Sequence, residues 1–143
     1  MFNNNFGLLA IVMTVTQLWV ASSVTAQNVV AGTASYYHES LEGNTTANGE
    51  IYRQAKLTAA HKSLPFDSWV LLSDRTGHTV VVRVNDRLPG NSSRLIDLST
   101  KAAHQLDMLR IGIKRVKMQV ISVEEAWRWY FDNGFINTYV AWR

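Results

Sequence analysis

Hydrophobic and polar residues alternate along two short segments of the chain, residues 79–84 and 114–120. Such alternation with a period of two is typical of strands that are buried on one face. In residues 79–84 three valines share one face. In residues 114–120 we expect Val116, Met118 and Val120 to point inward. The pattern therefore favours a fold built from short strands.

Three weaker strand candidates cover residues 29–37, 56–60 and 69–72. Turn residues such as Asn48-Gly49 and Pro89-Gly90 separate the candidates from one another. Several short strands with a small helix, in about 95 residues, favour a compact β-barrel over a sandwich or a parallel α/β sheet.

Two helices are predicted between and after these strands. Ser99 is expected to cap a helix that runs to about Arg110 and buries Leu106 and Leu109, among others. A second helix is predicted to begin at Ser122, because Ser122 and Glu125 have the spacing of a capping box, and to end near Asn133-Gly134. Its apolar stripe, which is formed by Ala126, Trp127, Tyr130 and Phe131, is expected to pack on the barrel.

The first 26 residues are predicted to be an export signal. Residues 7–20 are nearly all apolar, and small residues precede an expected cleavage site after Ala26. This run is shorter than the roughly 20 residues of a membrane-spanning helix. Residues 1–6 carry no Lys or Arg, which leaves an uncleaved anchor as the alternative. We expect a signal peptide at 1–26, a barrel domain at 27–122, an aromatic C-terminal extension at 123–143, and no stable membrane anchor after cleavage.

The charge and cysteine content narrow the possible partners and sites. The net charge is +3, and no basic run interleaved with aromatics indicates nucleic-acid binding. The chain has no cysteine, which excludes disulfides, thiolate metal ligands and a lipid-modified N-terminal cysteine. No two of the four histidines have metal-ligand spacing, so no metal site is expected.

The carboxylate with the clearest catalytic potential is Asp86, which ends the 79–84 strand just before a turn. Burial at this position would favour a general acid, whereas the neighbouring Arg83 and Arg87 favour the ionised form. On the local pattern alone, we favour the interpretation of Asp86 as a residue that only caps the turn.

Three further polar residues lie at comparable positions. His61 ends an apolar segment, Glu50 follows a turn, and Asp97 precedes the predicted helix cap. Each has an ordinary structural interpretation as well as a functional one. On local evidence we favour the structural one for His61 and for Asp97.

Five segments in this order resemble the rare lipoprotein A family. They are Gly-Thr-Ala-Ser-Tyr-Tyr at 32–37, Thr-Ala-Asn-Gly-Glu at 46–50, Leu-Thr-Ala-Ala-His-Lys-Ser-Leu-Pro at 57–65, Val-Val-Val-Arg-Val-Asn-Asp-Arg at 80–87 and Arg-Leu-Ile-Asp-Leu-Ser at 94–99. The resemblance covers about residues 30–120. It implies a mainly β fold, a six-stranded double-psi β-barrel with one or two short helices, to which this chain adds the aromatic C-terminal helix.

The resemblance also implies an activity. Members of that family are lytic transglycosylases that cleave the bond between N-acetylmuramic acid and N-acetylglucosamine in peptidoglycan glycan strands and leave a 1,6-anhydro end. It implies that Asp86 is the acid/base, that His61 positions or polarises it, and that Glu50 binds substrate or helps to stabilise the oxocarbenium-like charge. This chemistry requires no metal and no organic cofactor. We expect Tyr37, Asn85 and Arg87 to bind substrate. The expected location is the periplasm or the exterior, as a soluble protein that is not a lipoprotein.

Two positions depart from the family pattern. Leu88 stands where the family usually has Gly after Asn-Asp-Arg, and His38 stands where a Gly commonly follows the aromatic pair. A leucine beside the acid is expected to reshape the cleft or lower activity. A non-catalytic wall-binding or interaction module on the same barrel is therefore the alternative function.

Overall fold

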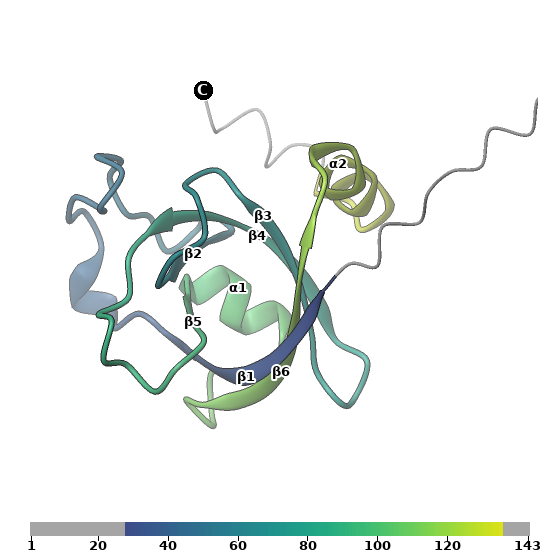
Figure 1. Ribbon diagram of the computed structural model, residues 1–143, viewed down its shortest axis with the longest axis horizontal. Coiled ribbons are helices and arrows are strands. Elements are labelled where there is room, and N and C mark those ends of the chain that lie inside the picture. The colour runs from purple at the N-terminus through teal and green to yellow at the C-terminus, as the bar shows by residue number, and fades with distance from the viewer. Residues whose placement is uncertain (1–27, 136–143) are drawn as a thin grey trace, which may run out of the picture.

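The computed structural model describes residues 28–135, and in this region six strands close into a barrel (Figure 1). The elements are β1 (Val29–Tyr36), the 3₁₀ turn η1 (Glu39–Leu41), β2 (Thr58–His61), β3 (Trp69–Ser73), β4 (Thr79–Asp86), β5 (Ile96–Leu98), α1 (Thr100–Gln105), β6 (Lys114–Ile121) and α2 (Val123–Asp132). The predicted signal segment lies outside the described residues. No helix within the described part is long and apolar enough to cross a bilayer.

The order of strands around the barrel is β1-β5-β2-β4-β3-β6. β1 pairs in parallel with β5, and β2 pairs in parallel with β4, while the other four pairings are antiparallel. Closure leaves no sheet edge exposed, which stabilises a small β domain. The expected six-stranded double-psi barrel is confirmed.

Both faces of β4 are buried. All three alternating valines of residues 79–84 are buried, but so are Val81 and Arg83 on the other face of the strand. One face of β4 points into the barrel, and the other lies under covering elements, since the hydroxyl of Tyr130 in α2 donates to the Val81 carbonyl. The expectation of a half-buried strand is therefore wrong for β4.

β6 follows its predicted alternation until its last residues. Val116 and Met118 are buried as expected, but Val120 is 43% exposed and Ile121 takes the buried position instead. Ile121 joins the core cluster that includes Ala126 and Tyr130 of α2. The strand thus leaves strict alternation where it meets the helix.

The first helix is shorter than predicted. Ser99 caps α1 by accepting a hydrogen bond from the Ala102 backbone, as expected, but α1 ends at Gln105. Asp107 adopts a positive φ of 48°, which turns the chain out of the helix. Met108 is consequently buried, and Leu109, which was expected inside, is 36% exposed.

The second helix begins and ends where predicted, with both hydrogen bonds of the capping box between Ser122 and Glu125 present. Only part of its predicted stripe is correct, however. Ala126 and Tyr130 are buried, whereas Trp127 and Phe131 are exposed. Tyr130 packs edge-on against Trp69 of β3, so the helix contacts the barrel through a narrower stripe than the sequence indicated.

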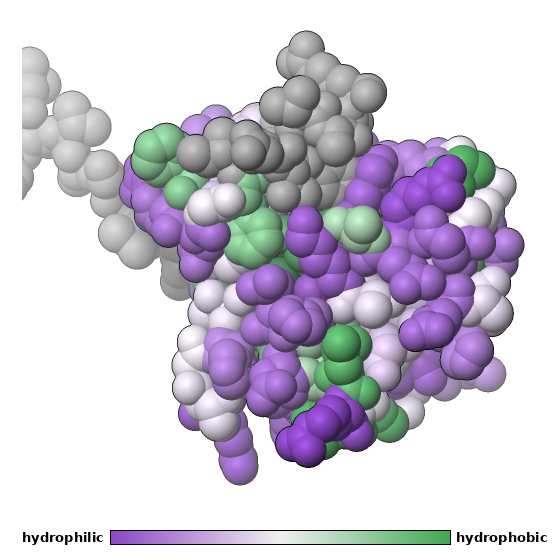
Figure 2. All heavy atoms as spheres, turned by 180° about the vertical axis from the view of Figure 1, so that it is seen from behind, coloured by the Kyte–Doolittle hydropathy of each residue, from purple (hydrophilic) through white to green (hydrophobic). Residues whose placement is uncertain are grey.

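One face of the molecule is largely polar. On the face drawn in Figure 2, hydrophilic side chains cover most of the described surface, and hydrophobic ones form small, separated patches.

Candidate functional site

Asp86 is the last residue of β4, and its carboxylate is held by three donors from three different segments. Oδ1 accepts hydrogen bonds from the backbone N–H groups of Ala47 and Arg87, both at 2.8 Å. Oδ2 accepts one from the Tyr37 hydroxyl at 2.7 Å. The side chain is only partly buried. These contacts fix the orientation of the carboxylate and still leave acceptor capacity on Oδ2.

Tyr37 follows β1 directly and packs against Tyr52 with ring centroids 4.6 Å apart. Burial, and then the hydrogen bond to Asp86, raise the pKa of the Tyr37 hydroxyl well above its usual range. The hydroxyl therefore stays protonated and remains a donor to Asp86. Tyr37 was expected to bind substrate, and its link to Asp86 was not foreseen.

Glu50 lies at the end of the turn at residues 46–50 and is bound to β4. Its Oε2 accepts from Arg83 at 2.7 Å and from Asn85 at 3.0 Å, while Oε1 accepts from Asn48 at 3.0 Å. The hydrogen bond from Arg83 is the main cause that lowers the pKa of Glu50 to about 2. Glu50 is therefore an ionised carboxylate that anchors the turn carrying the Ala47 N–H.

The two arginines near Asp86 have partners of their own. Arg83 forms ion pairs with Glu50 and with Asp67. The guanidinium of Arg87 lies 3.8 Å above the centroid of the Phe66 ring, which is a cation–π contact. Asn85 is buried, and its amide is bound to Glu50. Asn85 thus lies beneath the surface on which Asp86 is presented.

His61 ends β2, the parallel neighbour of β4. Its Nδ1 accepts from the backbone N–H groups of Ser63 and Leu64, at 3.2 and 3.0 Å, which places the proton of the neutral ring on Nε2. Burial, followed by the charges of Arg87 and Lys62, lowers the pKa of His61. No hydrogen bond joins His61 to Asp86 among residues 28–135. His61 directly follows Ala60, and Ala60 pairs with Asp86 across strands β2 and β4.

A second carboxylate, Asp97 in β5, lies two strands away from Asp86 at the same level of the sheet. Ala60 of β2 pairs with Asp86 on one side and with Asp97 on the other. Asp97 accepts two hydrogen bonds from Arg94, at 2.7 and 2.8 Å, and one from the Ser35 hydroxyl. The bidentate pair raises the pKa of Arg94. Because both oxygens of Asp97 are engaged, the structural interpretation favoured from the sequence describes it well.

The two departures from the family pattern have simple structural outcomes. Leu88 is buried, so its side chain packs inward after Asp86. His38 caps the η1 turn by accepting a hydrogen bond from the Ser40 backbone. Within residues 28–135 no group of three His, Asp or Glu side chains is arranged to hold a metal ion.

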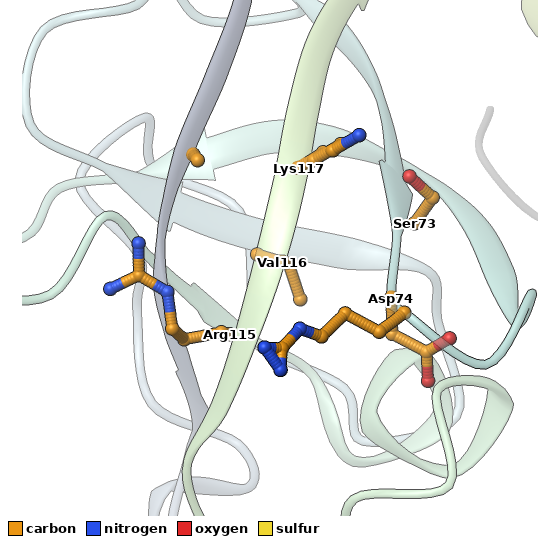
Figure 3. A pocket seen from close by; sticks show the side chains of 7 residues that line it. Ser73, Asp74, Arg115, Val116 and Lys117 are labelled. Carbon is orange, nitrogen blue, oxygen red and sulfur yellow. The ribbon is translucent and has the colours of Figure 1, made fainter.

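A large hollow of the described surface lies away from this site. It has a volume of about 410 Å³ and lies between the β3–β4 turn and β6 (Figure 3). The turn precedes Thr79, whereas Asp86 ends the same strand, so the two regions are separated by the length of β4, roughly 23 Å. None of the six predicted site residues lines this hollow.

A family model described as lytic transglycolase matches residues 29–118, which span the barrel. The endolytic peptidoglycan transglycosylase RlpA of Vibrio cholerae is 43% identical over 96 residues, which are 66% of this chain and 36% of that protein. The protein of the same name from Pseudomonas aeruginosa is 46% identical over 68% of this chain and 29% of its own length. The chain thus spans about a third of the length of the curated relatives it matches.

Solved structures share the fold at lower identity. The Streptomyces papain inhibitor superposes with a TM-score of 0.55 at 22% identity, covering 66% of this chain and 96% of its own. The apo expansin of Clavibacter michiganensis gives a TM-score of 0.54 at 22% identity, with 67% of this chain and 52% of the expansin covered. At this identity the likeness establishes the barrel and nothing about activity.

Proposed function

Because this chain belongs to the lytic transglycolase family, we propose that it cleaves peptidoglycan glycan strands as an endolytic transglycosylase. The bond cleaved is the one between N-acetylmuramic acid and N-acetylglucosamine, and the new end is a 1,6-anhydro muramic residue. Such a substrate lies outside the cytoplasm, which supports export to the periplasm or the exterior. The relatives that share the barrel carry the substrate class in their names.

The observation that carries the proposal is the fixed carboxylate of Asp86. Three donors hold it at the end of β4, yet the side chain is only partly buried and Oδ2 keeps acceptor capacity. A group that exchanges a proton with substrate needs this combination of defined orientation and access. The other carboxylates near it are each held in an ion pair, Glu50 with Arg83 and Asp97 with Arg94.

In the proposed reaction Asp86 serves as acid and then as base. Its proton passes to the leaving glycosidic oxygen as the bond from that oxygen to the anomeric carbon breaks. The muramic C6 hydroxyl then attacks the anomeric carbon and returns its proton to Asp86. One proton moves from O6 to O4, and no water is consumed. A hydrolytic route would need a second carboxylate to activate water. Glu50 and Asp97 are instead held in ion pairs with Arg83 and Arg94.

Neighbouring residues support this step in distinct ways. Tyr37 orients Asp86, and Glu50 with Asn85 holds the turn that supplies the Ala47 N–H. His61 is 8% exposed, and because backbone donors occupy its Nδ1, its Nε2–H is the group that we assign to a sugar hydroxyl or to the leaving oxygen. Arg87 is positioned beside Asp86 by its contact with Phe66. The negative charge of Glu50 also favours the oxocarbenium-like charge of the transition state.

The decisive experiment compares Asp86→Asn with the wild-type protein on intact and peptide-stripped glycan strands, with products identified by mass spectrometry. We expect anhydro-muramyl products from the wild type and a loss of at least about a hundredfold in Asp86→Asn. Asp107→Asn is the matched control, because Asp107 is exposed and Asn tolerates its positive φ.

Other outcomes select other functions. Reducing ends in place of anhydro ends would indicate hydrolysis. Binding without any product, unchanged in Asp86→Asn, would favour the alternative of a wall-binding module on the same barrel.

A further inference from the structure

Three cationic side chains surround the hollow at the far end of β4. Arg115 and Lys117 lie two residues apart on the outer face of β6, and Arg75 comes from the β3–β4 turn. Within residues 28–135 none of the three side chains forms an ion pair or a hydrogen bond. All three line the same hollow, and Figure 3 shows the Arg115 and Lys117 side chains directed to different sides of β6. Like charges that line one hollow repel each other. An anionic ligand would remove this cost.

The acidic residue at the hollow does not neutralise these charges. The side chain of Asp74 is fully buried and forms an ion pair with Lys114. Burial raises the pKa of Asp74, but hydrogen bonds from Lys114, His78 and Thr76 outweigh burial and hold the pKa well below its usual range. Figure 3 shows its carboxylate directed away from Arg115 and Lys117. Asp74 therefore secures the turn and leaves the hollow positively charged.

The floor of the hollow is made by small residues. Lys117 pairs across the sheet with Ala31 of β1 on one side and with Ser73 of β3 on the other. A methyl group and a hydroxymethyl group fill little space, so room remains beside the ammonium group for a ligand of about carboxylate size or larger. No hydrogen bond of the Ser73 hydroxyl is recorded within the described residues, so it can serve as a donor.

The hollow continues along the outer face of β6. A second depression of about 260 Å³ shares Ser73 and Lys117 with it and extends to Leu71 and Gln119. The combined groove has charged groups at one end and apolar and amide groups at the other. Such an arrangement suits a polymer that carries a carboxylate next to uncharged, amide-bearing units better than a small free anion.

We propose that this groove is a second binding site, which takes the carboxylate groups of a glycan strand through Arg75, Arg115 and Lys117. The choice of polymer rests on the proposed function. Two sources supply a carboxylate on such strands, the lactyl group of a peptide-stripped strand and the peptides of an intact one. Because the groove lies at the other end of β4 from Asp86, it holds the protein on the wall independently of cleavage.

The test measures binding of the purified protein to insoluble peptidoglycan at low salt by co-sedimentation. We expect Arg115→Gln/Lys117→Gln to raise the dissociation constant by about fivefold to tenfold. Added salt should reduce this difference between the variant and the wild type. Arg53→Gln/Arg110→Gln removes the same charge from exposed positions elsewhere and should change binding by about twofold or less. Equal binding by the two variants would overturn the proposal.

Three wall preparations identify the ligand group. A difference that persists on peptide-stripped strands assigns the lactyl carboxylate, and one seen only on intact wall assigns the peptide carboxylates. An undiminished difference on wall whose carboxyls have been amidated would overturn the proposal. Cleavage of short soluble strands is scored in parallel. If the wild type forms anhydro products and the double variant binds the wall as well as the wild type, the groove is refuted and the proposed function is not. If the double variant binds less tightly but the wild type forms no product, the proposed function is refuted and the groove is not.

Discussion

Single residues in this site act through neighbours that are distant in sequence. Glu50 illustrates this, because its carboxylate receives donors from Asn48 nearby and from Arg83 and Asn85 on another strand. These donors stabilise the ionised form, so the pKa of Glu50 falls to about 2. A carboxyl whose pKa is lower in the folded state than in the unfolded state stabilises the fold above its unfolded pKa. This contribution is lost as the pH falls toward the folded pKa.

Replacement of Glu50 by Gln should therefore have a pH-dependent cost. At pH 7 we expect the free energy of unfolding to fall by about 1 kcal/mol, a value reduced for the partial exposure of the side chain. Between pH 4.5 and about 2 the wild type loses this advantage, so the two unfolding curves should converge. Urea unfolding at several pH values measures the effect, with the exposed Glu124→Gln as control. A constant difference at all pH values would contradict the assignment.

At the scale of elements, the barrel depends on close approach between the start of β1 and the segment that leads into β5. Gly32 lies in β1, and a Cβ placed there would come within 2.6 Å of the Leu95 Cβ. The Leu95 backbone N–H donates to the Thr33 carbonyl at 2.8 Å, which holds the two segments together. Only a glycine allows this contact without displacing one of the segments.

We accordingly expect Gly32→Ala to destabilise the protein by about 1–3 kcal/mol, the usual cost of overpacking. Gly90→Ala is the matched control, since a Cβ at Gly90 meets nothing within 4 Å and its φ is not in the left-handed region. That control should change the free energy of unfolding by about 0.5 kcal/mol or less. Thermal unfolding of the two variants tests the contrast, and similar melting temperatures would show that the contact is easily relieved.

For the molecule as a whole, α2 is part of the barrel's core and not an appendage. Tyr130 is buried, donates to the Val81 carbonyl at 2.9 Å and meets Trp69, Trp129 and Phe135 edge-on. The helix therefore closes the outer face of β4, and barrel and helix should unfold as one unit.

This predicts different outcomes for two adjacent aromatic residues. Tyr130→Phe should lower the free energy of unfolding by about 1–2 kcal/mol, because it removes a buried hydrogen bond. Phe131→Ala should cost about 0.5 kcal/mol or less, because Phe131 is 69% exposed. Far-ultraviolet circular dichroism and tryptophan fluorescence should give coincident transitions in both variants. Separate transitions would mean that α2 detaches before the barrel opens.

Local interactions explain what could be predicted from the sequence. The caps at Ser99 and Ser122 were predicted correctly because a cap depends on residues within one helical turn. Alternation located β4 and β6 because side chains on a strand change face at every residue. β5 was missed, since three residues are too few to show a pattern. β4 was expected to be half-buried, because alternation does not reveal that covering elements bury its second face as well.

The sequence by itself determined the short strands, the helix caps and the ordered motifs that place Asp86 and His61 at strand ends. Only the tertiary structure decided which groups meet at Asp86, since Tyr37 is 49 residues away and the Ala47 N–H 39 residues away. It alone also placed Arg75 beside Arg115 and Lys117 at the opposite end of β4. The physical reason is that contacts between distant segments depend on strand register and barrel closure, and neither leaves a periodic signal in the chain.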